Sequence, residues 1–131
     1  MIVLDASATV EFLLGTDRGE RVARRLLDAS DRLHAPHLID VEVAQVLRRL
    51  VASGEIASER GEEALTDLGD LPVLRHPHHP LLPRVWTLRS NLTAHDAVYV
   101  ALAESLDAIL LTLDGRLARA RGHGARVDFV S

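Results

Sequence analysis

Short apolar segments alternate with longer amphipathic ones along almost the whole chain, and this alternation restricts the fold more than any other feature. Residues 2–4 and 109–112 predict buried strands, and weaker strands are expected at 34–36, 73–75 and 126–130. Helices are expected at 7–14, 18–29, 38–52, 58–68, 81–90, 93–106 and 116–121. Strands separated by helices predict a parallel sheet with helices on both faces.

The chain has the size and composition of one domain. It holds 131 residues, of which 47% are hydrophobic, and no repeat or linker divides it, so we expect a single domain over 1–131. It has no cysteine, which excludes disulfides, thiolate zinc sites and cysteine nucleophiles. The amino terminus lacks the features of a signal peptide, and no apolar run reaches the ~20 residues that span a bilayer. We therefore expect a cytoplasmic protein without a membrane segment.

The basic residues are unusual because all 15 are arginine. The absence of lysine excludes a phosphate-binding P-loop, Schiff-base chemistry and a response-regulator receiver. The net charge of −4 argues against a broad basic face for nucleic acid. A chain of this charge that acts on RNA needs local arginines or bound metal.

Four carboxylates occupy positions that suit a site. Asp5 follows the first strand and Asp114 follows the strand at 109–112, so the two face one crevice if those strands are neighbours. Glu42 lies at the border of the apolar stripe of its helix, and Asp96 lies in the first turn of another helix. Converging carboxylates favour a bound cation, and oxygen ligands suit Mg²⁺ or Mn²⁺.

Each of these acids also has a purely structural interpretation. Asp5 fits a helix cap, Glu42 fits a solvated helix surface, and Asp114 with Gly115 fits a turn. Asp96 stands three residues after Thr93, which is the spacing of a capping box. The metal-site hypothesis therefore depends on the four acids taken together.

Four segments resemble a known family in order and spacing. DAS at 5–7, PHLIDVEVAQVL at 36–47, LTAHDAVYVALA at 92–103 and LTLDGRL at 111–117 are similar to the acidic segments of PIN domains, and the length is similar to that of VapC toxins. The resemblance covers essentially the whole chain. Two features differ from the family pattern: His95 stands where an aromatic residue is frequent, and no further acid closely follows Asp114.

The resemblance implies a three-layer α/β/α sandwich and an endoribonuclease toxin that uses Mg²⁺, with Mn²⁺ as a substitute. It implies that Asp5, Glu42, Asp96 and Asp114 are the catalytic metal ligands, and that the hydroxyls of Ser7 and Thr112 support them. It also implies an RNA substrate, a product with a 5′-phosphate, a homodimer and a cognate VapB-type antitoxin. Arg116 follows Asp114 closely and is a candidate for binding RNA phosphate, although it also fits an ion pair with an acid.

Other residues and segments also allow a functional or a structural interpretation. The HPHHP segment at 76–80 suggests metal binding, but its prolines favour an exposed connecting loop. Core packing is the expectation for Trp86 and Tyr99, and a helix cap for Asp40. Two rival functions are a phosphate-transferring hydrolase, which usually needs a second aspartate where Ser7 stands, and a catalytically degenerate regulatory or assembly module.

Overall fold

The computed structural model describes residues 1–28 and 32–131. Its strands are β1 (Ile2–Leu4), β2 (Leu33–Pro36), β3 (Val73–His76), β4 (Ile109–Thr112) and β5 (Arg126–Phe129). Its helices are α1 (Ala6–Leu14), α2 (Asp17–Asp28), α3 (Leu38–Ala52), α4 (Ser58–Asp70), α5 (Leu82–Thr87), α6 (Ala94–Leu106) and α7 (Gly115–Ala118), with a 3₁₀ turn at His79–Leu81.

The strands form one parallel sheet in the order β3-β2-β1-β4-β5. The chain first builds outward from β1 to β3 and then returns to add β4 on the other side of β1. The order therefore reverses between β1 and β4, where an open α/β sheet leaves a crevice at the carboxyl ends of its strands. Leu4 is in register with Leu111, so the residues after both strands emerge at that crevice.

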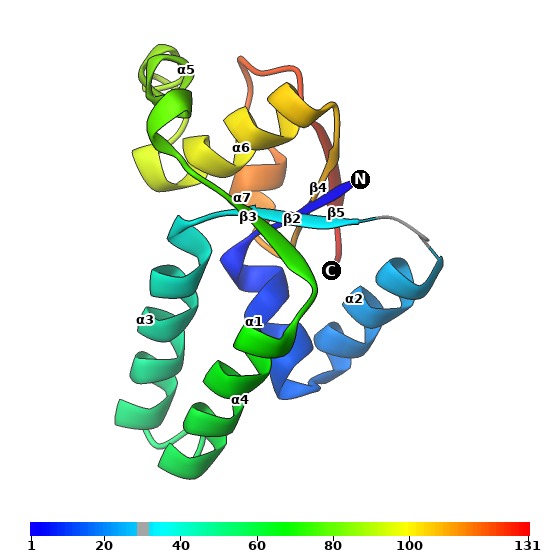
Figure 1. Ribbon diagram of the computed structural model, residues 1–131, viewed down its shortest axis with the longest axis vertical. Helices are drawn as coiled ribbons and strands as arrows, with labels where there is room; N and C mark the ends of the chain where they lie inside the picture. The colour runs from blue at the N-terminus through cyan, green and yellow to red at the C-terminus, as the bar shows by residue number, and fades with distance from the viewer. Residues whose placement is uncertain (29–31) are drawn as a thin grey trace.

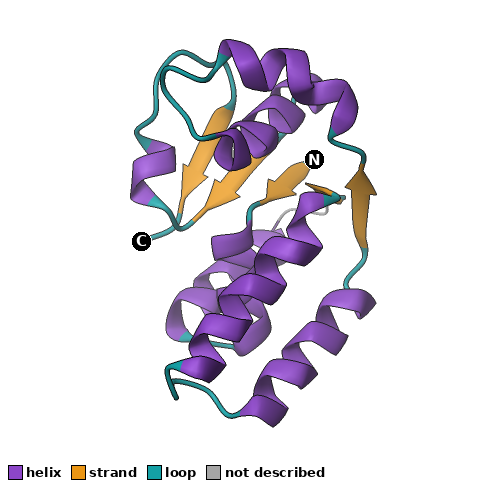
Figure 2. Ribbon diagram, turned by 90° about the vertical axis from the view of Figure 1, so that its left-hand side faces the viewer, coloured by secondary structure: helices purple, strands orange, loops and turns teal. Residues whose placement is uncertain are grey.

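Helices cover both faces of the sheet. Helices α1 to α4 gather on one side of it, and α5 and α6 lie on the other (Figures 1 and 2). Alternate residues of β1 point to opposite faces. Val3 packs in the cluster that contains the buried side chains of α6, whereas Ile2 and Leu4 pack with Ala8 of α1 and Val22 of α2. The predicted α/β/α sandwich is confirmed.

Most expected elements are present, with differences mainly at helix ends. The helix expected at 81–90 is a 3₁₀ turn followed by the short α5, and the helix expected at 116–121 ends at Ala118. The helix expected at 18–29 begins at Asp17, and its expected last residue, Ala29, lies outside the described residues. Among the described helices, none is long and apolar enough to cross a membrane.

Two expectations for single side chains were wrong. Trp86 is 67% exposed, because α5 is a short helix whose buried residue is Val85. Asp40 does not cap α3, since the cap position is His37; its carboxylate instead binds the guanidinium of Arg75 at 2.8 and 3.0 Å. This ion pair joins α3 to β3. Tyr99, in contrast, is buried as expected.

Candidate active site

Asp5 is the most deeply placed of the four acids, with 5% of its surface exposed. It leaves the carboxyl end of β1 and caps α1, since its Oδ1 accepts a hydrogen bond from the Ala8 N–H at 2.9 Å. Ser7 donates its hydroxyl to the same oxygen at 2.7 Å, and Thr112 donates its hydroxyl to Oδ2. The helix-cap interpretation of Asp5 is therefore correct, and it is compatible with a role as a ligand.

Burial dominates the ionisation of Asp5. Loss of solvation raises its pKa from 3.8 to about 6, although the three hydrogen bonds act in the opposite direction and the charge of Asp114 adds a further rise. Among the described residues, those that shift the pKa of Asp5 include no positive charge that offsets its burial. A cation at this position would supply it.

Ser7 and Thr112 bind Asp5 and also the turn after β4. The Ser7 hydroxyl accepts from the Leu113 N–H at 3.0 Å, and the Thr112 hydroxyl accepts from the Asp114 N–H at 3.0 Å. That these two hydroxyls support a metal site stays a prediction from the sequence resemblance. Their hydroxyls connect the carboxyl ends of the two central strands, so Asp5 and the Asp114 turn are held together.

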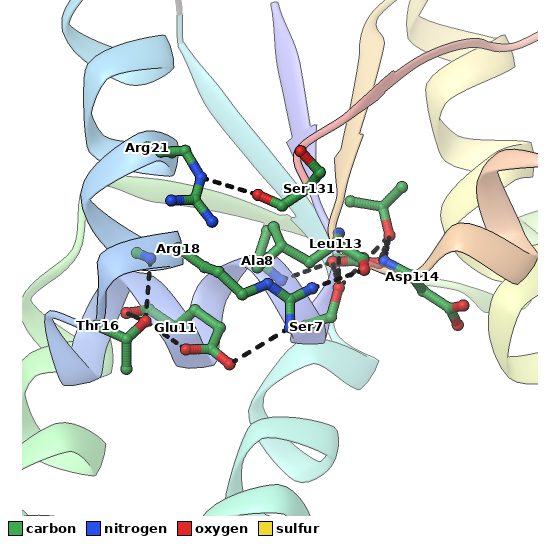
Figure 3. Close-up of polar contacts among 12 residues, drawn as sticks. Ser7, Ala8, Glu11, Thr16, Arg18, Arg21, Leu113, Asp114 and Ser131 are labelled. Atoms are coloured by element: carbon green, nitrogen blue, oxygen red, sulfur yellow. Dashed lines mark hydrogen bonds and ion pairs between the residues drawn. The ribbon is translucent and has the colours of Figure 1, made fainter.

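Arg18 of α2 supports the same turn, although the sequence did not mark it as a site residue. Arg18 donates from Nη2 to the Leu113 carbonyl at 2.9 Å, and its Nη1 lies 4.0 Å from the Glu11 carboxylate (Figure 3). Figure 3 also shows the Asp114 carboxylate directed away from Ser7 and toward the outside of this network. Arg18 therefore holds the turn through the Leu113 carbonyl, while the carboxylate of Asp114 remains accessible to solvent.

Asp114 and Asp96 both lie at helix starts. Asp114 caps α7 by accepting from the Arg116 N–H at 2.9 Å, and the Thr93 hydroxyl accepts from the Asp96 N–H at 3.2 Å. Arg116 links the two acids, because its Nη2 lies 3.3 Å from Asp96 Oδ2 and 3.7 Å from Asp114 Oδ2. Its side chain is 72% exposed, so these pairs are weak and readily exchanged.

Glu42 approaches from the side of α3. The Tyr99 hydroxyl donates to its Oε1 at 2.6 Å. Burial, this hydrogen bond and the charges of Glu42, Asp5 and Asp96 all raise the pKa of Tyr99 well above its usual 10. Three carboxylates from three elements thus act on one buried hydroxyl. Tyr99 stands three residues after Asp96, so helical spacing was the available signal that it faces the same site.

The donor chemistry of these acids fits a hard divalent cation. The four carboxylates are near one another, since Asp5, Glu42 and Asp96 all act on Tyr99 and Arg116 joins Asp96 to Asp114. Mg²⁺ prefers such oxygen ligands together with water. Within residues 1–28 and 32–131, however, no three His, Cys, Asp or Glu side chains form a closed metal cluster. A cation would have to draw the acids together and displace Arg116 from Asp96 and Asp114.

Two hollows flank this group of acids. One, of about 350 Å³, is lined by Asp96, Arg116 and Arg89 among others. The second, of about 420 Å³, is lined by Glu42, Arg49 and His95 among others. Each hollow is therefore lined in part by one of the four acids, Asp96 in the first and Glu42 in the second.

Among the described residues, the histidines of the HPHHP segment form no group with these acids that could hold a metal ion. His76 ends β3, and its Nε2 lies 2.8 Å from Nδ1 of the buried His34 on β2. Burial and the neighbouring His76 lower the pKa of His34. His78 and His79 are exposed, in agreement with the connecting-loop interpretation.

Comparison with known proteins identifies the family. A model of the PIN domain matches residues 2–123. Ribonuclease VapC12 of Mycobacterium tuberculosis is 45% identical over 131 residues, which is 100% of both chains. Ribonuclease VapC1 of the same organism is 46% identical over 129 residues, 98% of this chain and 96% of its own.

Solved structures agree in fold. The toxin VapC20 of Mycobacterium tuberculosis, described as cleaving the sarcin-ricin loop, has a TM-score of 0.70 at 14% identity and covers 90% of this chain and 93% of its own. FitAcB from Neisseria gonorrhoeae has a TM-score of 0.66 at 16% identity, with 97% and 96% covered. At these identities the likeness concerns the fold alone. The family match and the relatives of 45–46% identity show that the chain belongs to the PIN-domain family and, within it, to the VapC ribonucleases.

Proposed function

We propose that this chain is a Mg²⁺- or Mn²⁺-dependent endoribonuclease that serves as the toxin of a type II toxin–antitoxin pair. One observation carries the metal-dependent part of the proposal. Asp5 is buried at the strand-order reversal with a pKa raised to about 6, and Asp114 emerges from the neighbouring strand. The endoribonuclease part follows from membership of the VapC ribonucleases.

Each acid has a distinct part in holding the cation. Asp5 supplies a ligand whose direction is fixed by Ser7, Thr112 and the start of α1. Asp96 and Asp114 supply carboxylates from the exposed side of the crevice, and Glu42 supplies one that Tyr99 orients. When bound, the cation lowers the pKa of a water molecule and stabilises charge on the phosphodiester.

The proposed reaction is hydrolysis. Oxygen from water forms a new bond to the phosphorus, the P–O3′ bond breaks, and the 3′-oxygen leaves as a hydroxyl. The products are a 5′-phosphate and a 3′-hydroxyl. Arg116 stands beside Asp96 and is largely exposed, so its guanidinium can exchange the carboxylates for the substrate phosphate.

The proposal includes partners. RNA is the substrate, and a VapB-type antitoxin silences the enzyme. Arg116 supports one mode of silencing, because its contacts demonstrate that a guanidinium fits between Asp96 and Asp114. A homodimer and a cytoplasmic location stay predictions from the sequence.

Cleavage of total cellular RNA by the purified chain tests the proposal. We expect fragments in Mn²⁺, none with a chelator, and 5′-phosphate ends. Asp5→Asn and Asp96→Asn should abolish cleavage, whereas Asp67→Asn should not, since Asp67 is an exposed acid on α4. Cleavage that persists in chelator would refute metal dependence. A folded chain that neither binds Mn²⁺ nor cuts RNA would instead support the degenerate-module alternative.

A further inference from the structure

The hollow beside Asp96 has a polar lining that the four acids do not explain. Its volume is about 350 Å³, and Arg89, Asn91, Thr93 and Arg116 line it together with Asp96. Two of its lining residues, Asp96 and Arg116, belong to the candidate active site. We call this hollow the arginine cleft.

Arg89 is held in place by α5. Its Nη1 donates to the main-chain carbonyl of Trp86 at 2.9 Å, and the centre of its guanidinium lies 4.7 Å from the centroid of the Trp86 ring. This is the distance of a cation–π contact. These two contacts restrain the guanidinium at the cleft wall, which reduces the entropy lost when it binds an anion.

Trp86 presents a large aromatic surface that the core does not use. It is the only tryptophan of the chain and is 67% exposed. Exposed tryptophan is unusual in an isolated domain, and an indole is a strong platform for stacking an unpaired base. Arg89 contacts this ring and also lines the cleft, so it connects Trp86 to the cleft.

We propose that the arginine cleft and Trp86 bind one nucleotide of single-stranded RNA beside the scissile phosphodiester. Arg89 and Arg116 bind the phosphate, and the base stacks on Trp86. The inference rests on the proposed function, since it assigns a substrate subsite to the same active site.

The net negative charge of the chain supports a role of the arginine cleft in binding phosphate. The net charge is −4, so nonspecific attraction to RNA is weak and phosphate contacts must be local. Two guanidiniums in the same cleft supply such contacts and offset the repulsion between Asp96 and a phosphate. Stacking on Trp86 requires a base free of pairing, so the subsite selects single strands over duplexes.

The test is binding of a fluorescein-labelled single-stranded RNA of mixed sequence, followed by fluorescence anisotropy in EDTA at several salt concentrations. Arg89→Ala should weaken binding and lower the salt slope by ~0.7, the value for one phosphate contact on a single strand. Trp86→Ala should weaken binding roughly tenfold without changing the salt slope, because stacking involves no ion release. Arg24→Ala, which removes an exposed arginine on α2, should change neither quantity appreciably.

Two further variants separate the phosphate contact from stacking. Trp86→Phe keeps an aromatic face and should recover part of the lost affinity. Arg89→Lys keeps the charge and should restore the salt slope. Since Trp86 and Arg89 are exposed, all variants should melt at the wild-type temperature.

Cleavage assays in Mn²⁺ give an independent readout. Trp86→Ala and Arg89→Ala should raise KM more than they lower kcat, as expected for lost substrate binding. Wild-type RNA affinity in both variants, with cleavage intact, would overturn the inference and leave the proposed function standing. Equal affinity of the wild-type chain for duplex and single-stranded RNA would also overturn the inference. The same holds if the Trp86 and Arg89 variants weaken binding of the antitoxin but not of RNA. A wild-type chain that neither binds nor cleaves RNA would overturn both.

Discussion

The Tyr99 hydroxyl donates a hydrogen bond to Glu42 Oε1 across 2.6 Å and so joins the two helices that carry Asp96 and Glu42. Tyr99 lies on α6, three residues after Asp96, and its side chain is buried. Glu42 lies on α3 and is only partly buried. The bond therefore fixes the position of one carboxylate relative to the other, across helices that lie on opposite faces of the sheet (Figures 1 and 2).

Tyr99→Phe should lower the free energy of unfolding by ~1–2 kcal/mol, because it removes one hydrogen bond to a charged acceptor and keeps the ring that fills the core. Urea denaturation measures the change. The Tyr99→Phe/Glu42→Ala double variant should lose less than the sum of the two single variants. Strictly additive losses would indicate that the bond does not contribute to stability.

The raised pKa of Asp5 predicts a pH dependence in metal-free protein. The folded chain retains the proton up to about pH 6, whereas the unfolded chain releases it near 3.8. The native state thus binds more protons in this window, so the Asp5 contribution to stability is full below pH 3.8 and is lost as pH rises through 6. The loss is on the order of 3 kcal/mol, at ~1.4 kcal/mol per unit of pKa.

Asp5→Asn isolates this contribution, because its amide oxygen can still accept from Ala8 and Ser7 while the charge is gone. Other groups titrate in both proteins: Arg84 lowers the pKa of Glu104, and burial lowers that of His34. The measured quantity is therefore the difference between the two stability curves from pH 4 to 7. The variant should become the more stable protein above pH 6, and parallel curves would contradict the assignment.

Arg116 should compete with metal for Asp96 and Asp114. Arg116→Ala removes a guanidinium that lies 3.3 Å from Asp96, so we expect Mn²⁺ to bind a few-fold more tightly, in keeping with the ~0–1 kcal/mol of exposed ion pairs. Calorimetric titration measures this affinity, and Arg121→Ala is the matched control on an exposed arginine. Asp5→Asn should weaken the same titration. Unchanged affinity in Arg116→Ala would mean that Mn²⁺ binds away from these two acids.

The central strands and the acids at their ends could be predicted from the sequence, because both follow from short-range patterns. A buried apolar run followed by an acid marks Asp5 and Asp114 wherever the strands lie in the sheet. The pairing of β1 with β4 could not be predicted in this way, because it depends on contacts between residues more than 100 positions apart in the chain. The spacing of Thr93 and Asp96 likewise predicted their cap, since a cap is local.

Contacts between elements could not be predicted in the same way. The spacing of apolar residues predicts which side of a helix is buried, but not which element packs against it. The contacts of Tyr99 with Glu42 and of Asp40 with Arg75 were therefore not predicted. Trp86 was expected in the core because its size favours burial, yet the short α5 leaves it in solvent. The candidate acids can therefore be picked out from the sequence, whereas the contacts of their side chains can be known only from the tertiary structure.

Antitoxin and metal should compete for the same carboxylates. Arg116 lies between Asp96 and Asp114, so a guanidinium fits there. An antitoxin arginine that replaces Arg116 would supply the charge that metal would otherwise provide. Rising Mn²⁺ should then weaken the affinity of the antitoxin, measured by calorimetry at several Mn²⁺ concentrations. An Asp5→Asn/Asp96→Asn double variant should bind antitoxin less tightly and lose the Mn²⁺ dependence, because both ligands lose their charge partners. If the antitoxin affinity of both the wild-type chain and the double variant does not change with Mn²⁺ concentration, the antitoxin blocks access to the site without contacting the acids.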